Sequence, residues 1–206
     1  MIISALHKFI FVAIPKTGTH SVRQALRQHM GAQDMEQVGL FVKRQLPIAE
    51  LARLQHGHLS LQQVRPYFPP EEFKALFKFA FVRNPFDRFI SYCAFMTRAE
   101  GQFERNPQGV MRHFIDNPPP RHVLFQPQHS FVTDETGALL SDYIGRVEEM
   151  QASYDEICRR IGIPTATLEK VNPSKRMEYR QYYDQELIDG VAKLYARDLG
   201  LFGYEF

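Results

Sequence analysis

The sequence lacks the features of secreted, disulfide-stabilised and membrane proteins. It has only 2 cysteines among 206 residues. Cys93 and Cys158 show no metal-ligand spacing, so we expect two core thiols rather than a disulfide framework. The longest apolar run, residues 9–14, is far shorter than the roughly 20 residues that cross a bilayer. No signal-peptide cleavage pattern follows it, and the sequence therefore predicts a cytoplasmic protein without a membrane span.

Glycine and proline are also sparse, at 12 and 13 residues, and no internal repeat or low-complexity tract is present. With 44% hydrophobic and 23% charged residues, the composition excludes disordered, collagen-like and coiled-coil chains. A chain of this length can bury one sizeable core. We therefore expect a single domain over residues 1–206.

The net charge is small, +2, but it is unevenly distributed. Residues 1–100 carry 13 basic and 7 acidic side chains, whereas residues 101–206 carry 12 and 16. The positive excess in the first half favours an anionic ligand there. A nucleic-acid partner is not expected, because such a protein normally shows a denser basic stripe.

Hydrophobic patterns alternate between strand and helix along the chain. Strands are predicted at residues 7–14, 76–82 and 139–147, and helices at 19–30, after Asn84, at 148–161 and at 184–199. This alternation predicts an α/β fold whose central parallel sheet is flanked by helices on both faces. Residues 97–138, rich in Arg, Pro, Phe and Gln, are expected to be the irregular part.

The segment Ile14-Pro15-Lys16-Thr17-Gly18-Thr19-His20-Ser21 joins the first predicted strand to a helix. The amino end of a helix offers unpaired N–H groups and a positive dipole end to an anion. Gly18 allows close backbone approach, Lys16 supplies a charge, and the hydroxyls can donate hydrogen bonds. The alternative is that Thr17 or Thr19 only caps the helix and Lys16 is solvated.

A P-loop kinase is the obvious competing interpretation of this loop. If Gly18 is the second glycine of G-x-x-x-x-G-K-[ST], then Ala13, Thr19 and His20 stand where Gly, Lys and Ser or Thr are required. An NTPase also needs an acidic residue for Mg²⁺ after a neighbouring strand, and this chain has Arg83 there. The phosphotransferase stays an alternative that the residues disfavour.

Arg83 and Ser91 form a second candidate anion site. Arg83 follows the predicted strand at 76–82, and Ser91 lies about a turn and a half into the next helix, so both can face the carboxyl end of the sheet. A guanidinium offers a planar fork for phosphate oxygens. The alternative is local: Arg83 pairs with Asp87, and Ser91 bonds to a helix carbonyl.

Three stretches together resemble the sulfotransferase superfamily, specifically the carbohydrate-type branch (family 2) that includes heparan and chondroitin sulfotransferases. Residues 9–21 are similar to the loop that binds the 5′-phosphosulfate, 81–91 to the 3′-phosphate site, and 56–60 to the segment with the general base. Weaker matches are Pro127-Gln128, residues 142–148, 172–174 and 195–204. The resemblance implies a P-loop-like three-layer fold.

The resemblance also implies the chemistry. The donor would be 3′-phosphoadenosine 5′-phosphosulfate (PAPS), the product adenosine 3′,5′-bisphosphate (PAP), and the acceptor a hydroxyl of a saccharide or glycolipid, with no metal. Unlike Golgi-resident animal members, this chain shows no anchor, which suggests a cytoplasmic, bacterial-type enzyme. A catalytically silent nucleotide-binding protein remains the second alternative.

Residue roles carry over from the resemblance position by position. Lys16 would stabilise the leaving oxygen, and Arg83 and Ser91 would hold the 3′-phosphate. At His20 the cytosolic relatives usually have a hydroxyl residue, so only its backbone N–H is expected to contribute. Lys175 and Arg176 are candidates for closing over the donor, or are solvated loop charges. The phosphosulfate would be held by Lys16, Thr17, Gly18, Thr19, His20 and Ser21.

A base with a pKa near working pH is needed to accept the proton of a sugar hydroxyl, and histidine provides one. We predict His58 as the general base, with His56 as the second candidate and a carboxylate as a further one. The two histidines alone could be part of a metal site, but no third ligand has suitable spacing. The other six histidines are expected at surface or loop positions.

Overall fold

A computed structural model describes residues 1–37, 46, 48–169 and 177–206. Residue contacts divide the chain into two compact units. The sheet unit comprises Met1–Val82 and Ser130–Val171, and the helical unit comprises Arg83–His129 and Asn172–Phe206. The expectation of a single domain over residues 1–206 stays a prediction, and each unit is described below by itself.

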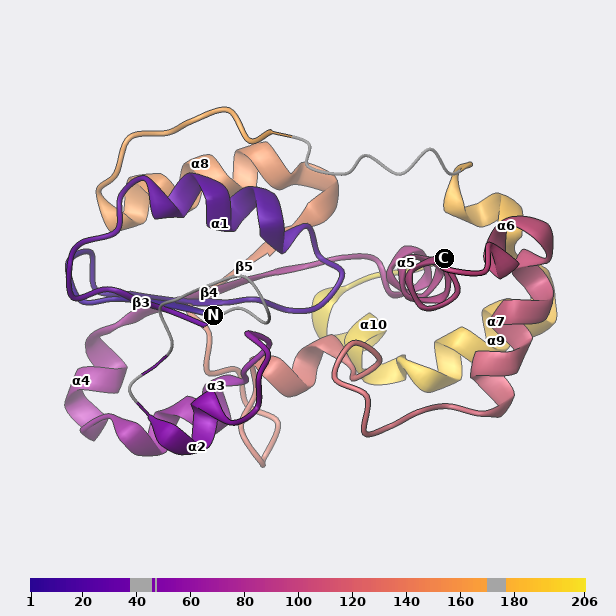
Figure 1. Ribbon diagram of the computed structural model, residues 1–206, viewed down its shortest axis with the longest axis horizontal. Helices are drawn as coiled ribbons and strands as arrows, with labels where there is room; N and C mark the ends of the chain where they lie inside the picture. The colour runs from indigo at the N-terminus through magenta and orange to yellow at the C-terminus, as the bar shows by residue number, and fades with distance from the viewer. Residues whose placement is uncertain (38–45, 47, 170–176) are drawn as a thin grey trace. The chain divides into compact units, whose positions relative to one another are not determined.

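The sheet unit is built on a five-stranded mixed sheet with the order β3-β1-β2-β4-β5 (Figure 1). β2 (Phe9–Val12), β4 (Phe77–Val82) and β5 (Tyr143–Arg146) are parallel neighbours, as the sequence predicts. β1 (Ile2–Ser4) and β3 (Met35–Glu36) add two antiparallel strands at one edge. Neither was expected, because strands of three and two residues are too short to show a periodic pattern.

Helices cover both faces of this sheet. α1 (Thr19–Arg27) and α8 (Met150–Ile161) lie on one face. The other face carries α2 (Ala49–Ala52), α3 (Leu61–Val64), α4 (Pro70–Ala75) and the 3₁₀ turn Arg65–Tyr67 (Figure 1). The α/β fold with a parallel core flanked by helices is therefore confirmed.

Both faces of the central strands are buried, which explains their nearly continuous apolar sequences. The rings of Phe11 and Phe79 stack with centroids 5.4 Å apart. The next residue in each strand, Val12 or Ala80, points to the opposite face and is equally buried from solvent. Cys158, a residue of α8, lies in the core of the sheet unit. It is a free, buried thiol, as is Cys93 in the helical unit, which confirms the expectation for both cysteines.

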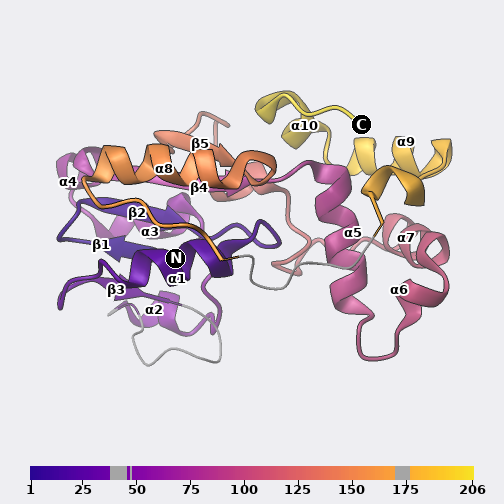
Figure 2. The ribbon, with the colours of Figure 1, turned by 90° about the horizontal axis from the view of Figure 1, so that it is seen from above.

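The helical unit contains α5 (Pro85–Met96), α6 (Gln102–Arg105), α7 (Pro107–Asp116), α9 (Gln185–Leu194) and α10 (Ala196–Phe202). A 3₁₀ turn, Tyr179–Tyr182, precedes α9, and another, Gln128–Phe131, begins in this unit. Figure 2 shows α7 and α9 side by side. Their apolar faces meet α5 in a core that includes Phe89, Met111, Leu187 and Val191.

Two expectations for this unit are wrong. Residues 97–138 are not simply irregular, because Asn106 caps α7 by accepting a hydrogen bond from the Gly109 N–H, and Pro107 occupies its first position. The helix predicted at 184–199 is two helices, α9 and α10, which meet at Tyr195.

No helix of the described residues is long and apolar enough to span a bilayer.

Candidate active site

The loop between β2 and α1 has the backbone geometry of an anion cradle. Lys16 and Gly18 both have left-handed backbone, with φ of 67° and 68°, and Thr17 between them does not. Alternation of handedness along a turn directs successive N–H groups to one side, which forms a concave site for an anion. A left-handed lysine is uncommon and costs free energy, so the fold must impose this geometry.

The amino end of α1 is not closed by a side chain. Its N-cap is Gly18, which makes no side-chain cap bond, and no acidic residue lies in the first turn. The Thr17 hydroxyl instead donates to the Ile14 carbonyl oxygen at 2.9 Å and is fully buried. The alternative in which a threonine caps α1 is therefore wrong. Because its hydroxyl proton has this partner, Thr17 would meet a donor oxygen through its backbone N–H.

Gly18 is favoured by its left-handed backbone, with φ of 68°. A Cβ at this position would meet only the flexible end of the Met150 side chain, at the start of α8, which could move aside. Thr19 and Ser21 are buried in the first turn of α1, whereas His20 is exposed. Residues 16–18 thus end the loop after β2, and residues 19–21 form the first turn of α1. That they bind a phosphosulfate stays a prediction.

His58 is held against this same loop. Its Nδ1 lies 2.7 Å from the Ala13 carbonyl oxygen. A carbonyl can only accept, so Nδ1 carries the proton and donates. Burial lowers the pKa of His58 to about 3, with smaller contributions from the charges of Arg23 and of the amino group of Met1. In the neutral ring, Nε2 is therefore unprotonated and able to accept a proton. This pKa lies well below the working pH at which the base was expected to titrate.

His56 is placed less favourably. Its ring centroid is 6.3 Å from that of His58, and its buried Nδ1 has no hydrogen-bond partner among the residues that the structure describes. Burial also lowers the pKa of His56. Without a partner that orients the ring, His56 is the weaker candidate for the base.

The charges around the loop are positive. Although the side chain of His20 is largely exposed, partial desolvation lowers its pKa, and the cations Arg23, Lys16 and Arg27 lower it further. Arg23 is itself buried, with its Nε 3.8 Å from a Glu36 carboxylate oxygen, and burial lowers its pKa to about 10. Sequence reasoning missed Arg23. Its only signal was a charge inside the apolar stripe of α1.

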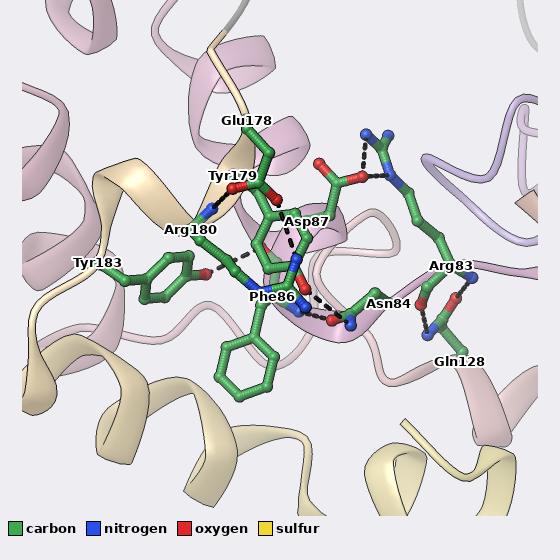
Figure 3. Close-up of polar contacts among 9 residues, drawn as sticks. All are labelled: Arg83, Asn84, Phe86, Asp87, Gln128, Glu178, Tyr179, Arg180 and Tyr183. Carbon is green, nitrogen blue, oxygen red and sulfur yellow. Dashed lines mark hydrogen bonds and ion pairs between the residues drawn. The ribbon is translucent and has the colours of Figure 1, made fainter. Parts of the chain in front are cut away.

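Arg83 directly follows the last residue of β4 and makes the local ion pair that the sequence left open. Its Nε and Nη2 both lie 2.6 Å from one carboxylate oxygen of Asp87, in the first turn of α5 (Figure 3). Asn84 caps α5 through a 3.0 Å bond accepted from the Phe86 N–H. Ser91 is buried on α5, 9% exposed. Binding of a 3′-phosphate by Arg83 and Ser91 stays a prediction.

A buried network behind Arg83 was not foreseen. The side-chain amide of Gln128 both accepts from the Arg83 N–H and donates to the Arg83 carbonyl, each at 2.9 Å (Figure 3). Asp198 accepts from the backbone N–H groups of Gln128 and His129 at 2.7 and 2.8 Å. The His129 ring also contacts Asp198 at 2.7 Å, so this histidine is not the loop residue that was expected. Only the weaker family matches at Pro127-Gln128 and at residues 195–204, which include Asp198, pointed here.

Two of the predicted donor-binding residues, Lys175 and Arg176, lie outside the described residues. Within the described part of the chain, no group of three or more His, Cys, Asp or Glu side chains could hold a metal ion.

Arg146 is a further cation at the carboxyl ends of the strands. It lies at the end of β5 and is paired in register with Val82. No role was predicted for it from the sequence.

A buried strand, an uncapped helix that follows a turn with Lys16, and a histidine bonded to that turn lie together in the sheet unit. The model of the sulfotransferase family matches residues 1–205. The chain belongs to this family. The match lies in the carbohydrate-type branch, family 2, and the sulfotransferases of this family use PAPS as sulfuryl donor. Membership decides against the P-loop kinase. No curated protein and no solved structure matches the chain significantly.

Proposed function

We propose that this sulfotransferase moves a sulfuryl group from PAPS to a hydroxyl of a saccharide or glycolipid by in-line displacement, with His58 as the general base. The observation that carries the proposal is the 2.7 Å bond between His58 Nδ1 and the Ala13 carbonyl. It ties the proton acceptor to the loop that would hold the group being transferred.

The loop fits the phosphosulfate of the donor. Two left-handed residues, Lys16 and Gly18, shape a turn of N–H groups at the uncapped end of α1. Three cations, Arg23, Lys16 and Arg27, surround His20 and lower its pKa in addition to partial desolvation, which supports a positive local potential. A multiply charged anion would compensate this potential and occupy the donors. When bound, the donor supplies an electrophilic sulfur and a phosphate leaving group.

Each proposed step uses a residue of this chain. His58 Nε2 accepts the proton of the acceptor hydroxyl as the oxygen bonds to sulfur. The bond between sulfur and the bridging oxygen breaks, and PAP leaves with its electron pair. The Lys16 ammonium stabilises the negative charge that grows on that oxygen. The sulfate ester and PAP account for all atoms, and the proton remains on His58 until solvent removes it.

The other end of the donor is assigned to the residues that follow β4. β4 and β2 are parallel neighbours, so their carboxyl ends lie at one edge of the sheet, where ligands of open α/β sheets bind. The chain runs directly from Val82 into Arg83. In the proposal, Arg83 and Ser91 hold the 3′-phosphate that distinguishes PAPS from other adenosine nucleotides.

The test is PAP formation from PAPS with a panel of saccharide and glycolipid acceptors, measured with and without EDTA. We expect acceptor-dependent PAP release that EDTA leaves unchanged. Release that requires Mg²⁺ would contradict the metal-free mechanism. Tight PAP binding with no release, over a broad panel of acceptors, would instead favour the silent nucleotide-binding protein.

A further inference from the structure

We infer that Gln128, supported by Asp198, is a positioning residue that fixes Arg83 for selective binding of the 3′-phosphate. The inference rests on the proposed function, because it assigns a role to residues behind the proposed phosphate-binding arginine. All the residues concerned belong to the helical unit.

Gln128 forms hydrogen bonds with both polar groups of the Arg83 backbone. Its Oε1 accepts from the Arg83 N–H and its Nε2 donates to the Arg83 carbonyl, both at 2.9 Å (Figure 3). This pairing resembles one rung of a β-ladder, although it comes from a side chain. It falls on the first residue after β4, where regular strand pairing stops. Gln128 is fully buried, so water does not compete for these bonds.

The amide of Gln128 has a fixed position because its own backbone is fixed. Asp198, in the first turn of α10, has no exposed surface. One of its oxygens accepts from the Gln128 N–H and the other from the His129 N–H. The His129 ring also contacts the carboxylate. A buried carboxylate that accepts several hydrogen bonds stays in place more firmly than a solvated one.

The side chain of Arg83 is oriented by a different residue, Asp87. Both Nε and Nη2 lie 2.6 Å from Asp87, and Asn84 anchors the start of α5 by donating to the Glu205 carbonyl at 2.8 Å. Gln128 thus sets where the Cα of Arg83 lies, and Asp87 sets how its guanidinium is turned. A guanidinium binds phosphate as a directional fork, so a small displacement costs affinity.

The consequence concerns selectivity. A misplaced Arg83 would weaken binding of PAP, which carries the 3′-phosphate. It would not affect adenosine 5′-monophosphate (AMP), which lacks it. General destabilisation of the protein would instead affect both ligands equally. The ratio of the two affinities therefore separates positioning from a merely structural role.

The experiment is calorimetric titration of PAP and AMP into the wild-type protein, Gln128→Met and Arg83→Ala. Methionine keeps the volume of glutamine and removes both hydrogen bonds. Gln181→Met, at an exposed position of the same unit, is the matched control. We expect Gln128→Met to bind PAP about 10-fold more weakly, as for about 1.4 kcal/mol of lost hydrogen bonding. Its AMP affinity should stay within about twofold, and Gln181→Met should match the wild type.

The outcomes separate the two claims. If the wild-type protein does not prefer PAP to AMP, the proposed function is overturned and this inference with it. If the wild type prefers PAP and Gln128→Met keeps the full preference, the positioning inference alone is overturned. Should Gln128→Met not fold, Asp198→Asn, which keeps volume and one acceptor oxygen, takes its place and must show the same selective loss.

Discussion

His58 donates from Nδ1 to the carbonyl oxygen of Ala13 over 2.7 Å, so the ring of the proposed base is bonded to the first residue of the loop between β2 and α1. This bond sets the tautomer. It leaves Nε2 unprotonated in the neutral ring, and burial keeps the ring neutral by lowering its pKa to about 3. Orientation and protonation state of the base therefore come from the same local packing.

Replacing His58 by asparagine separates its two roles. The side-chain amide introduced by His58→Asn can still donate to the Ala13 carbonyl, but it cannot accept a proton. We expect turnover to fall by about 100-fold or more, as for loss of a general base, with PAP affinity within about twofold by calorimetry. His56→Asn is the control and should keep most of the activity. Equal losses in the two variants would refute the assignment of His58.

The buried neutral His58 also predicts how stability depends on pH. The unfolded chain takes up a proton on His58 near pH 6.5, whereas the folded chain does so only near pH 3. Stability is therefore complete above pH 6.5 and falls as the pH drops below it, by at most about 1.4 kcal/mol per pH unit. Urea unfolding at pH 6.5, 5.5 and 4.5 should show a shallower loss in His58→Asn than in the wild type. Parallel curves would mean that His58 titrates normally.

Lys16 is predicted to act on the leaving group. Lys16→Ala should lower turnover by about 100-fold or more, because a cation at the developing charge is lost. Lys8 offers a matched control: it is also a left-handed lysine, with φ of 52°, but it lies in the exposed turn between β1 and β2. Lys8→Ala should leave turnover unchanged in the same PAP-release assay. A loss within a few-fold for Lys16→Ala would remove the leaving-group role.

Binding of an anion at the start of α1 should raise the pKa of His20. Burial and then the charges of Arg23, Lys16 and Arg27 lower the pKa of His20. Bound PAP would compensate these cations, so we expect the pKa of His20 to rise on saturation with PAP. An NMR pH titration of the imidazole resonance measures this, with uncharged adenosine as the control ligand. No change with PAP would place the anion away from the start of α1.

Hydrophobic and capping patterns in the sequence predicted the parallel strands of the sheet and the loop between β2 and α1. The runs that became β2 and β4 are apolar because both faces of these strands are buried, and Asn84-Pro85 marks the start of α5 by capping chemistry alone. Tertiary contacts determined the rest. The short strands exist because β1 pairs with β2 and β3 pairs with β1. The pattern of Val110, Met111 and Phe114 was compatible with a helix, but flanking prolines obscured it.

The site shows the same division. The strand-to-helix loop and the position of Arg83 follow from sequence order, so they were predictable. The clamp of Gln128 on Arg83 joins residues 45 positions apart, and Asp198 lies 70 positions beyond Gln128. Neither contact leaves a periodic or capping signature. Burial of Arg23 likewise depends on the pairing of β3 with β1, which brings Glu36 beside it.

The most direct test of the central claim is calorimetric titration of the wild-type protein and Arg83→Ala with PAP and, separately, with ATP plus Mg²⁺. The account predicts micromolar-range binding of PAP by the wild type, unchanged by EDTA and strongly weakened in Arg83→Ala, with ATP and Mg²⁺ binding more weakly. Preference for ATP with Mg²⁺, or PAP binding that does not depend on Arg83, would contradict the proposed donor site.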